Sequence, residues 1–258
     1  MANKTTNSQQ GHWLLAKMGK RVLRPGGKEL TQKLIDNLHI TSDDDIVEFA
    51  PGLGFTASIA LTKNPKSYKG VELNEAAAAS LRKTIGGVRR QIIIGNAAHS
   101  TLEKDSATKV FGEAMLTMQA DHRKSAIIQE AFRILKTGGL YGIHELSLAP
   151  NDIPETVKAE IQRALATVIK VNARPLTSLE WSLLLEKEGF EVVTISTSPM
   201  HLLEPRRIIE DEGFLRALKI GFNILTHPYE RSQIFSMRKI FKKYESHLSA
   251  VGIIAKKK

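Results

Sequence analysis

Short apolar runs recur along the chain at intervals that suit the strands of one sheet. They are rich in Val, Ile and Phe and are bounded by Pro, Gly and Asn, which is typical of buried strands. Segments with helical spacing lie between them, and this alternation predicts a doubly wound α/β fold with a parallel sheet. We expect seven strands, near residues 46–50, 67–73, 91–95, 109–116, 140–148, 191–197 and 249–255.

The segments between the strands carry helix signals. Residues 74–83 are rich in helix formers. Asp121 is expected to cap a helix that ends near Lys136, with the two following glycines as its stop. Thr177 and Glu180 have the spacing of a capping box before another helix.

About fifty residues separate the last two expected strands, too many for a structureless loop in a compact domain. Apolar residues recur there at helical spacing on both sides of a His-Pro pair, so we expect two amphipathic helices. They would cover the carboxyl ends of the strands, where open α/β sheets bind ligands. We expect Phe214, Phe222 and Phe241 to be buried against the sheet domain.

The first expected strand runs into a glycine-rich turn, Ala50-Pro51-Gly52-Leu53-Gly54, and Glu72 ends the second strand. Glycine lets the backbone approach a ligand where a Cβ would collide. A carboxylate at the end of the second strand is placed to accept the hydroxyl hydrogens of a ribose. These features predict a site for a nucleotide-type cofactor.

Two classes of cofactor compete for this site. Gly52, Gly54 and Ala57 have the spacing of the dinucleotide fingerprint, which favours a nicotinamide or flavin enzyme. Glu48 argues against that class, because a carboxylate near the turn would face a pyrophosphate with like charge. S-adenosylmethionine has no phosphate and carries an ammonium and a sulfonium, so an acidic residue suits it.

At these residues the chain resembles the class I S-adenosylmethionine-dependent methyltransferases, in particular the small-molecule group that includes the ubiquinone and menaquinone enzymes. Ala50 stands where the family's first glycine usually lies. The resemblance rests on an ordered set of motifs at residues 48–54, 72, 95–97, 113–119 and 130–139. It implies a Rossmann-like doubly wound seven-stranded sheet, mostly parallel with an antiparallel last strand, plus a helical cover.

The resemblance also implies where S-adenosylmethionine binds and S-adenosylhomocysteine is released. The implied cofactor-binding residues are Glu48, Ala50, Pro51, Gly52, Gly54, Glu72, Leu73, Asn96, Ala97 and Glu113. We interpret the chain as a single methyltransferase domain. Its parts are an N-terminal helical cap (1–40), a cofactor-binding core (41–198), a helical insertion (199–247) and a last strand (248–258).

Charge is unevenly distributed around a formal net value of +10. Residues 1–40 carry seven Lys and Arg against two acids and residues 200–258 twelve against six, whereas the remainder is nearly neutral with eighteen against nineteen. Basic flanks can attract nucleic acid, an anionic membrane surface or an anionic small substrate, and they are equally typical of solvated helix faces. The acidic run Glu210–Glu212 argues against a lipid-facing helix.

The chain has no cysteine, which excludes disulfides, thiolate zinc sites and methylation through a cysteine adduct. Its eight histidines show no paired ligand spacing, so we expect no metal site. No apolar stretch is long enough to span a bilayer, and the N-terminus lacks the regions of a signal peptide. We therefore expect a cytoplasmic location.

Candidate bases follow the expected strands. His144 and Glu145 end the fifth strand and are the catalytic candidates, while His99 and His201 follow the third and sixth. A lone histidine is more often a hydrogen-bonded structural residue than a catalyst, so packing of His144 against backbone is the alternative.

The sequence predicts in-line transfer of a methyl group to a small organic acceptor. An RNA methyltransferase that uses the basic flanks is the alternative. Amino methylation of a base is disfavoured, because residues 113–119 lack the Asn/Asp-Pro-Pro-aromatic motif of those enzymes. A third interpretation is a cofactor-binding protein without transferase activity.

Overall fold

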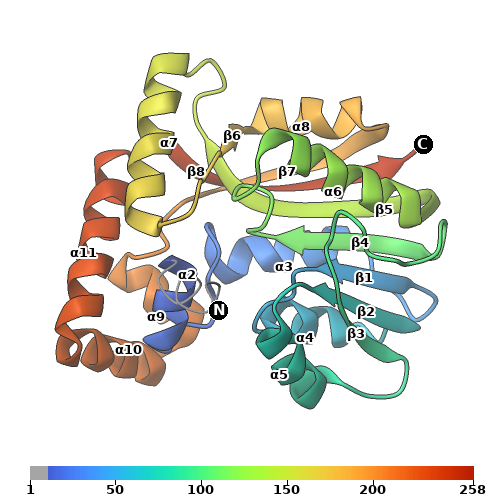
Figure 1. The fold of residues 1–258 in the computed structure, drawn as a ribbon, viewed down its shortest axis with the longest axis horizontal. Coiled ribbons are helices and arrows are strands. Elements are labelled where there is room, and N and C mark those ends of the chain that lie inside the picture. Colours follow the sequence, from blue (N-terminus) through green and yellow to red (C-terminus); the bar gives the residue numbers. More distant parts are fainter. Residues whose placement is uncertain (1–10) are drawn as a thin grey trace, which may run out of the picture.

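One twisted sheet organises the molecule. The computed structural model describes residues 11–258, and its strands follow the spatial order β3-β2-β1-β4-β5-β8-β7 (Figure 1). All pairings are parallel except those of β8, which runs antiparallel to both β5 and β7. The strands are β1 (Asp45–Phe49), β2 (Ser67–Glu72), β3 (Arg90–Ile94), β4 (Ala107–Glu113), β5 (Leu135–Leu148), β6 (Leu176–Thr177), β7 (Phe190–Pro199) and β8 (Leu248–Lys257).

This sheet confirms the predicted Rossmann-like fold with an antiparallel last strand. The seven expected strands are present, and a two-residue strand, β6, pairs with the end of β5 in addition. Sequence patterning could not predict β6, because a two-residue strand is too short for an apolar period.

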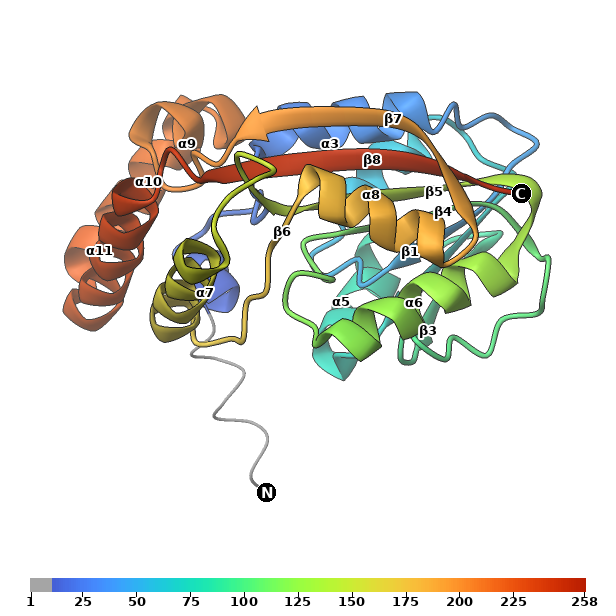
Figure 2. The same cartoon turned by 90° about the horizontal axis from the view of Figure 1, so that it is seen from above.

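Helices cover both faces of the sheet. One face carries α3 (Gly27–Asn37), α4 (Phe55–Leu61) and α5 (Glu75–Ile85), and the other carries α6 (Asp121–Ile134) and α8 (Ser178–Lys187). Figure 2 shows α3 and α8 on opposite sides of β8. Apolar residues of each helix set form a separate buried cluster with the strands, which is the arrangement expected of a doubly wound sheet.

One predicted helix start is confirmed, and the predicted bounds of another helix are wrong. Thr177 and Glu180 form the expected capping box at the start of α8. The helix predicted to run from an Asp121 cap to Lys136 is corrected at both ends, because its cap is Ala120 and it ends at Ile134. The next residue, Leu135, is already extended and pairs with β4, so the glycines expected to stop the helix lie inside β5.

A helical cover lies at the carboxyl ends of the parallel strands (Figure 1). It consists of α2 (Gly11–Lys17), α7 (Glu155–Ile169), α9 (Pro205–Glu212), α10 (Phe214–Thr226) and α11 (Pro228–Lys243). Residues 199–247 thus form three helices where two were expected: α9 is additional, and Gly213, with a φ of 81°, separates it from α10.

The predicted burial of the cover's phenylalanines is wrong for two of three. Phe214 is 62% and Phe222 67% exposed, whereas Phe241 is half-buried against the apolar clusters of the cover. The reason is that α10 packs on α9 and α11 rather than on the sheet, so only its opposite face, with Ile220, is buried.

The N-terminal segment is held to other helices of the cover by polar contacts. Lys17 forms an ion pair with Glu230 of α11 at 2.6 Å. The backbone N–H groups of Arg21 and Val22 donate to the Glu212 carboxylate at 2.7 and 2.8 Å.

Across residues 11–258 no helix combines the length and apolar character needed to cross a bilayer.

Candidate active site

The turn after β1 presents its backbone to a cavity. Ala50, Gly52 and Gly54 all have positive φ (53°, 56° and 77°), and Ala50, Pro51 and Gly52 line the cavity. A Cβ on Gly52 would meet only open space and one distant carbonyl, so this glycine leaves room for a ligand. A Cβ on Gly54 would lie 2.8 Å from Leu81, which shows that Gly54 permits close packing of helices and lies behind the cavity lining.

Glu72 points into the same cavity from the end of β2. Its carboxylate accepts the backbone N–H of Gly52 at 3.0 Å and that of Asn74 at 2.8 Å. These two bonds fix the carboxylate and leave other lone pairs free, so it can accept hydroxyl hydrogens of a ligand. The turn and Glu72 are therefore brought together as the sequence predicted.

Three other predicted cofactor residues lie beside the cavity rather than on its lining. Leu73 is 69% exposed, Ala97 is buried in the core, and Asn96 uses its side-chain oxygen to accept the N–H of Ala98. Asn96 thus shapes the turn after β3, which adjoins the end of β2 in the sheet.

Glu48 is buried one residue before the end of β1, outside the cavity lining. It accepts the hydroxyl hydrogen of Tyr68 at 2.7 Å. Burial raises the pKa of Glu48 to about 8, and the Tyr68 hydrogen bond only partly opposes this effect. A neutral acid is therefore the favoured form of Glu48 near neutral pH in the absence of a nearby cation.

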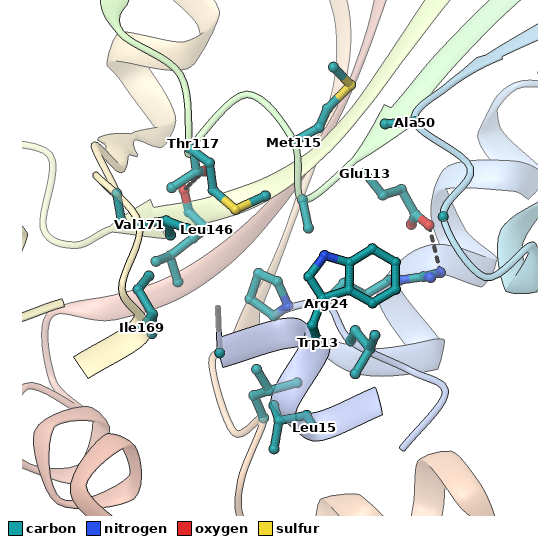
Figure 3. Close-up of a pocket in the computed structure, with 18 of the residues that line it drawn as sticks. Trp13, Leu15, Arg24, Ala50, Glu113, Met115, Thr117, Leu146, Ile169 and Val171 are labelled. Atoms are coloured by element: carbon teal, nitrogen blue, oxygen red, sulfur yellow. Dashed lines mark hydrogen bonds and ion pairs between the residues drawn. The ribbon is translucent and has the colours of Figure 1, made fainter. Parts of the chain in front are cut away.

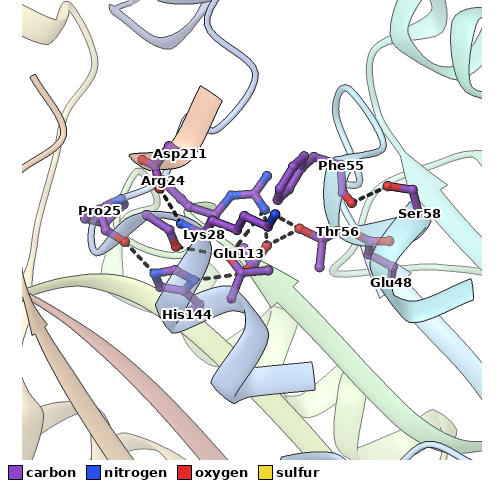
Figure 4. A network of polar contacts seen from close by, with 12 residues as sticks. Arg24, Pro25, Lys28, Glu48, Phe55, Thr56, Ser58, Glu113, His144 and Asp211 are labelled. Carbon is purple, nitrogen blue, oxygen red and sulfur yellow. Dashed lines mark hydrogen bonds and ion pairs between the residues drawn. The ribbon is translucent and has the colours of Figure 1, made fainter. Parts of the chain in front are cut away.

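Glu113, at the end of β4, is the centre of a polar network (Figure 4). It accepts hydrogen bonds from Arg24 (2.7 Å), Thr31 (2.8 Å) and Thr56, and faces Nδ1 of His144 at 2.7 Å. Burial by itself would raise the pKa of Glu113, but Arg24 and His144 outweigh it and lower the pKa to about 2. Glu113 is a fixed anion that ties the N-terminal segment to the sheet.

His144 is fully buried and has both ring nitrogens engaged. Nδ1 faces the Glu113 carboxylate and Nε2 the carbonyl of Pro25. Both ring nitrogens are therefore occupied by contacts within the protein, and neither faces the cavity. His144 also lies outside the cavity lining. The prediction that it contacts an acceptor does not fit this geometry, and the packed alternative does.

Glu145 is equally buried and faces the other side of β5. It accepts the backbone N–H groups of Met115, Leu116 and Thr117, and the hydroxyl of Thr117 at 2.8 Å. Burial raises its pKa, and these hydrogen bonds oppose that shift. The carboxylate shapes the loop after β4 and does not line the cavity. Alternation along a strand explains why neighbouring residues have such different partners.

The remaining histidine candidates are also outside the lining. His99 is exposed after β3, and His201 faces Glu245 on the surface at 3.4 Å. Among the described residues no group of three His, Asp or Glu side chains could hold a metal ion.

The cavity has a volume of about 270 Å³ and two unlike ends (Figure 3). The polar half, at the strand ends, is lined by Arg24, Ala50, Pro51, Gly52, Leu53, Glu72, Glu113, Ala114 and Met115. The apolar half, under the cover, is lined by Leu15, Leu146, Leu165, Ile169, Val171, Ala173, Met200, Leu202, Met237 and Phe241.

Sequence reasoning missed Arg24 and the residues of the apolar half. Arg24 precedes a Pro-Gly-Gly turn, and this turn signal in the N-terminal segment was the available clue. The apolar half is assembled from α2, α7, α11 and several connections, whose contacts no local pattern specifies.

Comparison with known proteins identifies a domain family and a relative of the chain. Residues 47–143 match the methyltransferase domain family. An uncharacterized protein of Haemophilus influenzae (strain ATCC 51907 / DSM 11121 / KW20 / Rd) is 35% identical over 252 residues, which cover 96% of this chain and 98% of that protein.

Two solved structures show the same fold at low identity. The [4+2]-cyclase SpnF has a TM-score of 0.73 at 14% identity, covering 97% of this chain and 94% of its own. Geranyl diphosphate C-methyltransferase from Streptomyces coelicolor A3(2), in complex with Mg²⁺, geranyl diphosphate and S-adenosyl-L-homocysteine, has a TM-score of 0.62 at 18% identity, covering 89% of this chain and 78% of its own.

Three observations agree on the kind of site. They are the glycine turn after β1, the carboxylate that ends β2, and the family match. Its open backbone and the Glu72 carboxylate that lines the cavity are compatible with S-adenosylmethionine. Residues 47–143 carry the methyltransferase domain, and the chain as a whole has the fold of the class I S-adenosylmethionine-dependent methyltransferases.

Proposed function

We propose that this methyltransferase acts on a small organic acceptor whose body is largely apolar. The observation that carries the proposal is the apolar half of the cavity, which is lined by aliphatic, aromatic and methionine side chains. Three of these, Leu165, Ala173 and Met237, are at most 1% exposed, so they form a stable wall. Burying apolar surface against such a wall stabilises an apolar ligand.

The cofactor is proposed to lie in the polar half. Glu72 would accept the ribose hydroxyls, and the backbone from Ala50 to Gly52 would contact the methionine moiety. Behind these contacts, Asn96 shapes the turn after β3 by accepting the N–H of Ala98, and Gly54 allows close packing behind the turn after β1. Glu48, Leu73 and Ala97 lie beside the cavity. Glu113 and Arg24 place a charged pair at the junction of the two halves.

The lining contains few groups able to take a proton. Its ionisable residues among those described are Arg21, Arg24, Glu72 and Glu113. Glu113, with a pKa of about 2, is a weak base, and arginine is not one. We therefore propose an acceptor atom that needs little deprotonation, such as an amine, thiol or phenol, with alignment and exclusion of water supplying most of the acceleration.

The RNA alternative gains no support. Nucleic-acid sites expose basic side chains and stacking surfaces along a groove. The wall of this cavity under the cover is instead formed by aliphatic, aromatic and methionine side chains.

The test is a screen for S-adenosylhomocysteine formation with acceptors in matched pairs that share one nucleophile and differ in apolar body. The proposal predicts turnover that rises with apolar size up to a limit. A Glu72→Ala variant serves as the cofactor control, because it should lower turnover of every acceptor alike. Equal turnover of polar and apolar partners, or turnover of RNA alone, would overturn the proposal.

A further inference from the structure

Helix α10 exposes a continuous apolar stripe. Leu215 is 82% and Phe222 67% exposed, and neighbouring residues of the stripe are similar. Of the sixteen exposed large apolar side chains among the described residues, eight lie between Ile209 and Phe235. We call these the α10 face: Ile209, Phe214, Leu215, Leu218, Phe222, Leu225, Tyr229 and Phe235.

Helical geometry explains why the stripe remains outside. At about 100° per residue, the exposed apolar side chains of α10 fall within roughly one third of its circumference. The opposite side carries Ile220, which is buried, and Asn223, whose amide donates to the carbonyl of Met18 at 3.0 Å. The helix has already buried one face in the fold, so the α10 face is a second, unpartnered one.

Two of the three acidic residues that argued against a lipid-facing helix are turned away from this surface. Asp211 and Glu212 have side chains only 1% exposed. Asp211 accepts the backbone N–H of Lys28 at 2.8 Å, and Glu212 accepts those of Arg21 and Val22. Their charge is used inside the molecule.

What remains exposed around the stripe is basic. Lys219, Lys239 and Lys242 are exposed, and Arg206 is 93% exposed. In α9 to α11 the one acid with a largely accessible side chain is Glu210, which pairs with Arg206 at 3.0 Å and is 48% exposed. An apolar stripe bordered by cations, with few anions, is complementary to an anionic lipid surface.

An apolar groove opens from the same surface. It lies between α9, α10 and α11, has a volume of about 280 Å³, and includes Ile209, Phe214, Leu218 and Phe235 in its walls. Leu15 of α2 lines both this groove and the apolar half of the active-site cavity. The groove thus continues the apolar surface inward as far as the active-site wall.

We propose that the α10 face docks on the surface of an anionic phospholipid bilayer. Leu215, Phe222 and their neighbours enter the boundary between headgroups and acyl chains, and Lys219 contacts lipid phosphates. Docking does not depend on the proposed acceptor, but it would bring the active site to the place where an apolar acceptor concentrates.

The experiment is sedimentation of the full chain with vesicles of phosphatidylcholine alone or mixed with phosphatidylglycerol. We expect binding to the mixed vesicles to exceed binding to the neutral ones at least about tenfold, and to weaken with salt. Leu215→Ser combined with Phe222→Ser should reduce binding by at least about tenfold. The matched control is Leu179→Ser with Leu183→Ser on α8, since these leucines are 50% and 54% exposed and lie outside the α10 face.

A charge arm completes the test. Lys219→Glu should weaken binding to the mixed vesicles severalfold, and Lys83→Glu, an exposed lysine on α5, should not. Unchanged melting temperature and S-adenosylhomocysteine affinity in each variant confirm folding. The proposal is overturned by absence of vesicle binding, by equal loss in the α8 control, or by patch-dependent self-association in light scattering without vesicle binding, which would assign the α10 face to a second copy of the chain.

Discussion

The two halves of the cavity are built by different means. In the polar half, a carboxylate is held by backbone N–H groups from its own turn and the adjoining one, as Glu72 is by Gly52 and Asn74. In the apolar half, side chains from α2, α7, α11 and their connections meet with no shared local motif. The first arrangement depends on short-range chain geometry, whereas the second depends on how distant segments pack. With cofactor and acceptor placed as proposed above, acceptor choice can change while cofactor binding stays constant.

The largest expected effect concerns Glu48, which lies behind the polar half. Its folded-state pKa of about 8 exceeds the ordinary value of 4.5, so the folded chain keeps a proton that the unfolded chain releases. The Glu48 contribution to stability is full below about pH 4.5, declines as the pH rises to about 8, and is then constant. At about 1.4 kcal/mol per pKa unit, the loss is up to roughly 5 kcal/mol.

Glu48→Gln removes this titration while its amide oxygen can still accept the Tyr68 hydrogen bond. Urea unfolding at pH 5 and pH 9 measures the change in the free energy of unfolding. We expect the fall in stability to be several kcal/mol smaller in the variant than in the wild type. Parallel pH profiles for the two proteins would show that Glu48 does not titrate in this range.

The next effect concerns the junction between the halves. Arg24→Ala removes the cation beside the buried Glu113 carboxylate, and we expect a loss of about 3–5 kcal/mol in the free energy of unfolding. Lys63→Ala removes a cation at a similar distance from Asp36, 2.8 Å, but on the surface, and should cost less than about 1 kcal/mol. Similar losses for the two variants would mean that the network around Glu113 contributes no more to stability than a surface ion pair.

A smaller effect is expected from a change in the polar half alone. Glu72→Ala should weaken S-adenosylmethionine binding by about 1–3 kcal/mol, because hydrogen bonds to a charged group are lost. Calorimetry gives the dissociation constant, and Glu75→Ala, an exposed carboxylate three residues later, is the control. If both variants bind like the wild type, Glu72 does not hold the ribose.

The smallest effect is expected in the apolar half. Val171→Trp narrows its wall and should lower kcat/KM for the acceptor by about tenfold, with cofactor affinity within about twofold of the wild type. Thr167→Trp, on the exposed side of α7, controls for the added ring. A loss of cofactor affinity in Val171→Trp would show that the two halves are not independent.

The sequence predicts the polar half of the cavity better than the apolar half, because the polar half depends on residues close together in the chain. Strand positions, the turn from Ala50 to Gly54 and the capping box at Thr177 depend on neighbours in the chain, so patterns revealed them. The stripe that includes Phe214 and Phe222 was correctly identified as helical and wrongly assigned to the interior. A periodic pattern shows that a helix has an apolar face but not which of its faces the fold covers.

The catalytic candidates illustrate a second limit. His144 and Glu145 lie inside β5, level with the end of β4, and the sequence could not show that their partners are Pro25, Glu113 and the loop from Met115. Those contacts join residues about 30 to 120 positions apart, and they turn both side chains into supports of the backbone.

The N-terminal segment has a consequence for the order in which the protein is made. Arg24 and Pro25 leave the ribosome early, but their partners Glu113 and His144 follow about 90 and 120 residues later. The partner of Lys17, Glu230 of α11, is synthesised later still. Because the chain is synthesised from its N-terminal side, Arg24 and Pro25 are made before the residues that hold them and reach their final contacts only after those residues have followed. The cavity lining runs from Gly11 to Phe241, so it is complete only once α11 has been made.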